Sequence, residues 1–214
     1  MEEPPSDARA VTVGARRLPG WLAGFVARHG GANVEADEHT LVLTGADDAR
    51  AWVRVPFAPL AFATATPVAA LVEHVQRART VGVLLVRRGG YAAGVFAGAE
   101  LVSSKVGSSY VQGTTKAGGW SQHRYARRRA NQAAAAFADA ADVAVRVLLP
   151  RAGDLDAVVC GGDRLAVDAT LADVRLEPLR PLVTGGLLAV PDPRLKVLQA
   201  TPEQFRSVRI RLSP

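Results

Sequence analysis

The chain has 214 residues, 49% of them hydrophobic, so it can bury a core and form one or two domains. It contains no run of about 18 apolar residues, which excludes a membrane-spanning helix. Basic residues outnumber acidic ones by 26 to 20, for a formal net charge of +6, and the single cysteine excludes a disulfide within the chain. The acidic, proline-containing start "MEEPPSDAR" lacks the basic and apolar parts of a signal peptide, so we expect a cytoplasmic protein.

The first segment of the chain predicts one helix followed by a pair of strands. Residues 18–31 carry a proline near their start and a glycine pair at their end, a pattern typical of a short helix. Residues 33–45 and 49–57 alternate apolar and polar side chains as strands do, and the acidic pairs at 37–38 or 47–48 supply turns. We therefore expect a small helix-plus-hairpin unit.

A second helix is predicted over residues 67–79. Its apolar side chains recur along one side: Val68, Leu71, Val72 and Val75. We place a domain boundary after this helix. Residues 1–79 then form a small N-terminal α+β unit, and residues 80–214 form a second, larger domain.

The second domain is expected to start with three strands. Residues 81–107 contain an apolar strand, a glycine-pair turn and two further strands, which predict an antiparallel meander. A helix from about 121 to 141, a buried strand at 157–162 and a helix over about 163–174 follow. Three strands, a helix, a strand and a helix suggest a ribonuclease-H-like α/β arrangement. Cys160 lies within the apolar run of the fourth strand, where we expect a small core residue.

Positive charge is concentrated in one stretch of this domain. No carboxylate occurs between Glu100 and Asp139, while six basic residues fall inside this window: Lys105, Lys116, Arg124, Arg127, Arg128 and Arg129. A solvated helix face beside a basic loop would explain a charge run of ordinary length. Because this acid-free window is long, its field favours a polyanion, and we predict binding of nucleic acid.

The helix that begins near Ser121 separates small side chains from basic ones. At about 100 degrees per residue, one face carries alanines and a phenylalanine, and the opposite face carries arginines. The small face comprises Ala126, Ala130, Ala133, Ala134, Phe137 and Ala141, and the opposite face comprises Arg124, Arg127, Arg128 and Asn131. We expect the small face to pack and the basic face to point outward. Ser121 is placed to cap the helix N-terminus, whose free amides and dipole attract phosphate.

The segment Lys116–Gln132, "KAGGWSQHRYARRRANQ", resembles the central loop and helix of the eukaryotic and archaeal class-one release factors. In that family a GGQ tripeptide precedes a helix of the form R-F-A-R-x-R, which residues 124–129 match as R-Y-A-R-R-R. The loop differs, because two further residues separate Gly119 from Gln122. This Gly-x-x-Gln arrangement is similar to that of the Vms-like release factors (VLRF), and the composition fits their compact actinobacterial branch. The resemblance covers about residues 81–183.

This resemblance implies a peptidyl-tRNA hydrolase that releases nascent chains on stalled or obstructed large (50S) ribosomal subunits, in ribosome-associated quality control. The ester is already reactive, so the catalyst mainly has to orient one water and stabilise the oxyanion. A glutamine amide suits positioning, because it offers donors and an acceptor but no useful pKa. The resemblance thus assigns catalysis to Gln122 with Gly118 and Gly119, whose backbone can approach the substrate closely.

The resemblance also implies a set of RNA-binding residues around the loop. Its members are Lys105, Lys116, Trp120, Ser121, His123, Arg124, Arg127, Arg128, Arg129 and Asn131. We expect no cofactor and no metal, and we expect a monomer whose partners are the 50S subunit and peptidyl-tRNA, without membrane contact. Residues 80–214 would then be the catalytic domain, while residues 1–79 would assist docking.

Other interpretations stay open from the residues alone. The glycine loop could be only a flexible lead into the helix, with Trp120 packing locally. A ribonuclease-H-type nuclease needs metal-binding carboxylates starting on the first strand, and residues 81–88 carry none. We expect the acids further along to be turn, cap and surface residues: Asp154, Asp156, Asp163 and Asp168. The four histidines lack metal-ligand spacing, and no GxxxxGK[ST] motif occurs. The alternative function is a non-catalytic RNA-binding or ribosome-rescue module, and Gln122 distinguishes the two.

Overall fold

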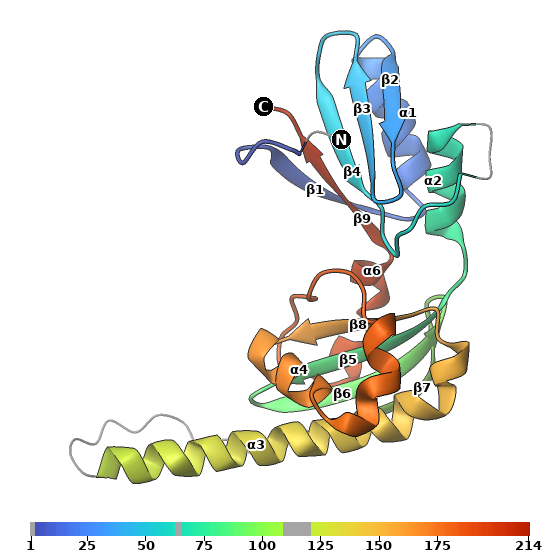
Figure 1. The fold of residues 1–214 in the computed structure, drawn as a ribbon. Coiled ribbons are helices and arrows are strands. Elements are labelled where there is room, and N and C mark those ends of the chain that lie inside the picture. The colour runs from blue at the N-terminus through green and yellow to red at the C-terminus, as the bar shows by residue number, and fades with distance from the viewer. Residues whose placement is uncertain (1–2, 63–65, 109–120) are drawn as a thin grey trace. The chain divides into compact units, whose positions relative to one another are not determined.

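The computed structural model of the chain describes residues 3–62, 66–108 and 121–214, and of residues 121–131 it describes the helical backbone only. The chain divides into two compact units. The first is made of Met1–Arg77 and Glu203–Pro214, and the second of Ala78–Pro202. Each unit contains one sheet with helices packed on it (Figure 1).

The first unit is built on a five-stranded antiparallel sheet with the order β1-β9-β4-β3-β2. Its strands are β1 (Arg9–Gly14), β2 (Ala32–Ala36), β3 (Thr40–Gly45), β4 (Arg50–Arg54) and β9 (Ser207–Leu212). Asp37 closes the turn between β2 and β3, because its Oδ1 accepts hydrogen bonds from the backbone nitrogens of His39 at 2.7 Å and Thr40 at 2.8 Å. Asp47 acts similarly before β4, accepting from the nitrogen of Ala49 at 3.2 Å.

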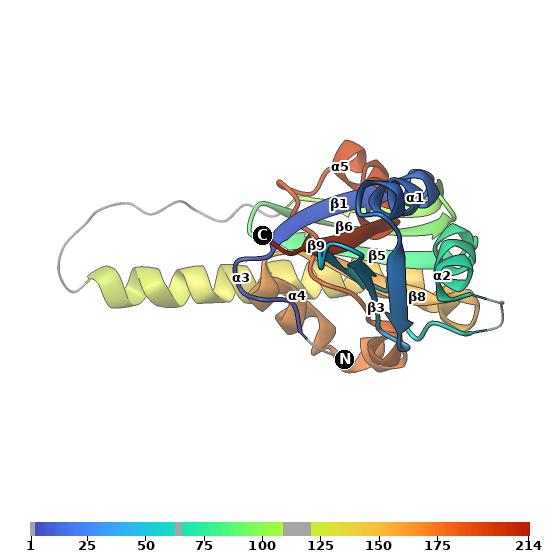
Figure 2. The same ribbon diagram turned by 90° about the horizontal axis from the view of Figure 1, so that it is seen from above.

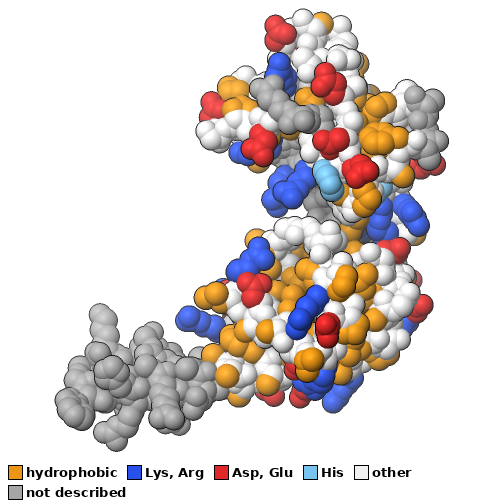
Figure 3. Space-filling view, viewed as in Figure 1, with side chains coloured by type: hydrophobic (Ala, Val, Ile, Leu, Met, Phe, Trp, Pro, Cys, Tyr) orange, Lys and Arg blue, Asp and Glu red, His pale blue; other side chains and the backbone are white. Residues whose placement is uncertain are grey.

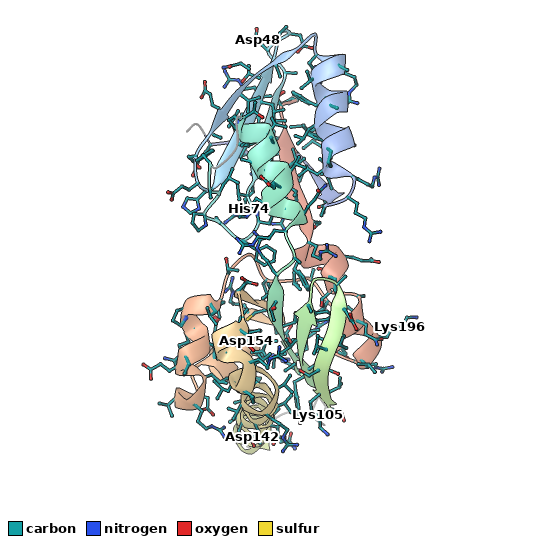
Figure 4. All side chains as sticks on the ribbon, turned by 90° about the vertical axis from the view of Figure 1, so that its right-hand side faces the viewer. Asp48, His74, Lys105, Asp142, Asp154 and Lys196 are labelled. Atoms are coloured by element: carbon teal, nitrogen blue, oxygen red, sulfur yellow. The ribbon has the colours of Figure 1, made fainter. Side chains whose placement is uncertain are left out.

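Helices α1 (Leu18–Arg28) and α2 (Pro67–Gln76) cover one face of this sheet. Each has a proline in its first turn, where the missing N–H is not needed. Alternation along the strands turns one set of apolar side chains toward these helices. The core formed between sheet and helices includes Leu22, Phe25, Leu41, Leu43, Val53, Leu71 and Ile210. Figure 4 shows both helices in front of the sheet, so its other face carries no helix formed by the described residues.

The predicted helices and hairpin of the first unit are confirmed, but the sequence patterns do not predict β1 and β9. Strand β9 pairs with both β1 and β4. The structure therefore differs from the expected division at one end, because Glu203–Pro214 belongs to the first unit. The six residues of β9 alternate like a strand, but their partners lie far earlier in the sequence, where no local pattern can reveal them.

The second unit contains a four-stranded sheet with the order β7-β6-β5-β8. Strands β5 (Thr80–Arg87), β6 (Gly90–Ala97) and β7 (Glu100–Gly107) form the antiparallel meander, and β8 (Ala157–Gly162) lies parallel to β5. Two parallel bridges continue the sheet beyond β8, from Val158 to Val183 and from Gly161 to Leu188. This order and direction of strands confirm the ribonuclease-H-like α/β arrangement.

Helices α3 (Ser121–Leu148) and α4 (Arg164–Leu171) pack on one face of this sheet, together with the 3-10 helix η2 (Val174–Leu182). Helix α5 (Leu195–Gln199) lies on the opposite face, where Leu198 fills the space above Gly94. The remaining helical segments are η1 (Leu149–Asp154) and α6 (Pro202–Phe205). Within the described ranges, no helix combines the length and the apolar character that crossing a membrane requires.

Helix α3 is longer than predicted and packs with a somewhat different face. It ends at Leu148 instead of near Ala141, because apolar side chains continue the buried stripe. The buried side chains are Ala136, Ala140, Ala141, Val143, Ala144, Val147 and Leu148. Ala134, expected on the packed face, is exposed. A run of alanines offers little difference in hydrophobicity between neighbouring positions, so the pattern did not resolve the edge of this face.

Candidate functional site

The candidate site lies where the chain passes from β7 into α3. Helix α3 begins at Ser121, as predicted, whereas the first buried side chain described on it is Ala136. At 1.5 Å per residue the backbone between these positions spans about 22 Å. Figures 1 and 2 show this N-terminal part of α3 running past the end of the sheet. The backbone of α3 therefore extends beyond the sheet of the second unit at the N-terminal end of the helix.

Most of the predicted site residues have no described side chain. Four lie in residues 109–120, outside the described residues: Lys116, Gly118, Gly119 and Trp120. Eight lie in the part of α3 of which only the backbone is described: Ser121, Gln122, His123, Arg124, Arg127, Arg128, Arg129 and Asn131. Their roles in catalysis and RNA binding stay predictions. Among the predicted site residues, Lys105 alone has a described side chain.

Lys105 is an exposed residue near the end of β7. It pairs with Ala93 of β6, whose side chain belongs to the core under α3. Directly opposed residues of antiparallel strands point to the same face, so Lys105 lies on the α3 side of the sheet. In Figure 4, which looks along α3, the labelled Lys105 lies beside this helix. One predicted RNA-binding residue thus shares a face with the helix into which the loop leads.

A close contact holds the end of β7, from which the loop starts. Gly107, the last residue of β7, pairs with Tyr91 of β6. A Cβ at position 107 would lie 2.5 Å from Tyr91 Oη and overlap the ring carbons Cε2 and Cζ, so the ring occupies the space that a side chain would need. Tyr91 is half-buried against the core cluster under α3, and burial together with Asp139 and Asp142 of α3 raises its pKa. Tyr91 therefore links the strand before the loop to the helix after it.

Sequence reasoning missed this pair. A glycine at the end of a strand indicates only a turn, and a tyrosine near the start of a strand is ordinary. The signal is their cross-strand pairing, which depends on the register of β6 against β7. That register contains an irregularity between Val95 and Phe96, which the sequence does not mark.

Charged contacts tie the C-terminal half of α3 to η2. The Arg175 Nη2 atom lies 2.8 Å from Asp142 Oδ1 on α3 and 2.7 Å from Asp173 Oδ2. Hydrogen bonds from Arg175 lower the pKa of Asp173 to about 2, and the two carboxylates raise the pKa of Arg175. Because these groups are open to solvent, the network adds little to the free energy of folding. The buried stripe of α3 is the main anchor of the helix.

The carboxylates of the second unit that the sequence singled out have local partners. Strand β5 itself carries no carboxylate. Nowhere in the described ranges do three or more His, Cys, Asp or Glu side chains form a group able to hold a metal ion. The partners are Arg151 for Asp154 at 3.0 Å, the backbone nitrogen of Thr80 for Asp156 at 2.7 Å, Arg87 for Asp163 at 3.5 Å, and Arg164 for Asp168 at 3.9 Å.

Cys160 is a buried core residue on β8, as predicted. Burial raises the pKa of its thiol to about 12, so the thiol stays protonated and is not a nucleophile. Two histidines of the first unit also have local partners. His29 Nδ1 lies 2.9 Å from Asp47 Oδ2, and His74 Nε2 lies 2.8 Å from the carbonyl oxygen of Pro56.

Comparisons with solved structures identify proteins of low sequence identity. The archaeal translation termination factor aRF1 is 19% identical, with a TM-score of 0.43 over 59% of this chain and 36% of its own. An archaeal protein is 20% identical, with a TM-score of 0.41 over 65% of this chain and 38% of its own. The chain thus spans little more than a third of the length of these two proteins. The Vms1 mitochondrial localization core is 9% identical, with a TM-score of 0.48 over 94% of this chain and 81% of its own. No curated protein matches the chain.

The comparison with protein families covers the candidate site. The family model described as Actinobacteria/chloroflexi VLRF1 release factor matches residues 79–211. This range includes the four strands of the second unit, the loop after β7 and all of α3, and it amounts to well over half of the chain. The protein therefore belongs to the VLRF1 release-factor family of Actinobacteria and Chloroflexi, as the resemblance of its loop and helix predicted.

Proposed function

We propose that this release factor is a peptidyl-tRNA hydrolase that frees nascent chains on stalled or obstructed 50S ribosomal subunits. Membership of a release-factor family implies interaction with the ribosome and with tRNA. The observation that carries the finer proposal is the form of α3. Its backbone starts at Ser121, so the Gly-x-x-Gln sequence ends within its first turn, and Figures 1 and 2 show this part of the helix running past the end of the sheet. A rigid arm of this kind suits a loop that has to enter a deep catalytic centre.

The composition of the loop supports the same proposal. Residues 117–121 carry no charge, whereas basic residues precede them and follow them in the sequence. An uncharged tip can enter a crowded RNA cavity without binding phosphates on the way. The arginines of α3 and Lys105 of β7 would then hold the RNA at the entrance. We assign the contact with tRNA or ribosomal RNA to Lys105, Lys116, Arg124, Arg127 and Arg128.

Gln122 would act by positioning, with no acid or base supplied by the protein. A water molecule adds to the ester carbonyl carbon, the bond from this carbon to the ribose oxygen breaks, and the released ribose oxygen takes up the proton that the water loses and becomes a hydroxyl. The Gln122 amide can accept a hydrogen bond from the water, and a backbone N–H near it can face the oxyanion. Gly118 and Gly119 would let the backbone approach the ester closely. We propose a cytoplasmic monomer that needs no cofactor.

The decisive test is single-turnover release of peptide from peptidyl-tRNA bound to 50S subunits, at saturating protein. Gln122→Ala should lower the rate about 10-fold to 1000-fold, as the loss of one positioning or oxyanion group does. Binding to the 50S subunit should survive. The matched control is Gln112→Ala, which removes a glutamine from the same loop outside the Gly-x-x-Gln sequence and should leave the rate unchanged. A Gln122→Ala protein as fast as the wild type would contradict the proposal and favour the non-catalytic RNA-binding module.

A further inference from the structure

The helix-free face of the first unit's sheet carries a group of arginines. Core residues of β4 and β9 point toward α1 and α2, so the residues between them point to the other face. On β4 and β9 these include Arg50, Arg54, Arg209 and Arg211. We name this set the arginine face. It is separate from α3 and from the loop, which belong to the second unit.

Two of these arginines face each other across neighbouring strands. Arg54 of β4 is the direct partner of Arg209 of β9, and both are exposed. Thr40 of β3 and Thr12 of β1 complete the row on either side. Like charges in directly opposed positions destabilise a sheet. In the part of the chain that the structure describes, neither arginine forms a hydrogen bond or an ion pair through its side chain, so nothing there offsets the repulsion.

The next row of the same face contains a buried donor without an acceptor. Trp52 of β4 lies between Arg211 of β9 and Val42 of β3. It is 5% exposed, and its Nε1 atom has no hydrogen-bond partner among the described residues. Buried polar groups are nearly always paired, so an unpaired indole N–H calls for an explanation. Because this nitrogen is itself buried, an anion on the surface of the face does not reach it, and the inference rests on the arginines.

Carboxylates are absent from the strands that form this face, apart from the edge strand β2. The sequences of β1, β3, β4 and β9 contain no Asp or Glu, whereas β2 contains Glu35. The two adjoining turns carry four acids, Asp37, Glu38, Asp47 and Asp48, of which Asp37 and Asp47 accept backbone hydrogen bonds that close the turns. The side of the first unit that the helices leave free is turned to the left in Figure 3, where blue basic side chains gather below red acidic ones.

We infer that the arginine face binds the phosphate backbone of RNA. Guanidinium groups match phosphate geometry, and the two threonine hydroxyls add neutral donors in the same row. A phosphate between Arg54 and Arg209 would also turn their repulsion into attraction to a shared anion. The inference rests on the proposed function in one respect, because it takes ribosomal RNA as the RNA that is bound. The first unit would thus hold the ribosome while the second unit presents the loop.

The test compares the full-length double variant Arg54→Gln/Arg209→Gln with a control of equal charge, Arg17→Gln/Arg28→Gln, at the two ends of α1. Binding is measured over a salt series, to 50S subunits carrying peptidyl-tRNA and to a fluorescently labelled hairpin RNA. Loss of two phosphate contacts should weaken both affinities about tenfold or more at about 150 mM salt and reduce the slope of log affinity against log salt by about 2. The control should bind like the wild type. Peptide release at saturation should keep the wild-type rate, and the Tm should stay unchanged or rise as the repulsion disappears.

Unchanged affinity and salt slope in the double variant would overturn the inference. Weaker binding to 50S subunits with unchanged binding to the RNA hairpin would also overturn it, because the partner would then be a ribosomal protein. A lowered Tm would show that the arginines serve folding. The binding test is then repeated with the single variant Arg54→Thr, because threonine is favoured in strands and should keep the sheet folded. Arginine-dependent RNA binding without peptide release would defeat the proposed function and leave this inference standing. Peptide release by a double variant that binds RNA with wild-type affinity would overturn this inference and leave the proposed function standing.

Discussion

Replacing Gly107 by alanine should destabilise the second unit through a clash with Tyr91. The added Cβ would lie 2.5 Å from Tyr91 Oη and overlap Cε2 and Cζ, whereas carbon atoms in contact sit about 3.5–4.0 Å apart. The ring therefore has to move by roughly 1 Å, away from its packing under α3. Overpacking of this kind costs about 1–3 kcal/mol. When Tyr91 is alanine the space is empty, and alanine at position 107 should then be favoured over glycine by about 0.5–1 kcal/mol, because glycine is a poor strand residue.

Urea unfolding of the wild type, both single variants and the double variant measures this reversal of sign. The expected coupling energy between the two positions exceeds about 1 kcal/mol, which a double-mutant cycle resolves. Gly153→Ala is the matched control, because no atom lies within 4 Å of its missing Cβ and the free energy of unfolding should hardly change. An equal cost of Gly107→Ala with and without the Tyr91 ring would refute the reasoning.

Two further predictions follow from the division into units and from the contacts of η2. A fragment of residues 78–202 should be folded and monodisperse, whereas a fragment of residues 80–214 should be cut by proteases within β9, because this strand then lacks both of its partners. Protection of β9 in the longer fragment would contradict this prediction. Asp173 has a folded pKa of about 2 against an ordinary value of 3.8, so it stabilises the fold fully above about pH 4, and this contribution is lost as the pH falls through 2. The Tm difference between wild type and Asp173→Asn should therefore shrink from pH 5 to pH 2. A difference that stays constant over this range would exclude the pairing with Arg175.

Helices and strands whose sequence pattern repeats within the element itself were predicted correctly. The helix at residues 18–31, the helix from residue 67 and the meander at 81–107 all appear, because periodicity, proline and glycine act locally. The start of α3 at Ser121 was likewise predictable from the change from a glycine loop to a helical pattern. The range that the family model matches includes this segment.

Features that depend on pairing between distant segments were not predictable. The sequence of β9 is a short alternation of apolar and polar side chains, and only its pairing with β1 and β4 makes it part of the first unit. The contact of Tyr91 with Gly107 depends on a register, and the opposition of Arg54 to Arg209 depends on a pairing across most of the chain. Each of these three features involves side chains that look ordinary in sequence. Their effect on stability depends on a partner residue that only the folded structure brings next to them.

The position of β9 sets the order in which the chain can be completed on the ribosome. β1 is translated first, yet its hydrogen-bonded neighbour is translated only after the whole second unit. The second unit is continuous in sequence and can fold while β1 and β4 still present unpaired edges. Closure of the first sheet is then the last folding step. Since β9 brings Arg209 and Arg211, a nascent or truncated product that lacks it holds only half of the arginine face, and the complete face exists only on chains whose second unit has been translated in full.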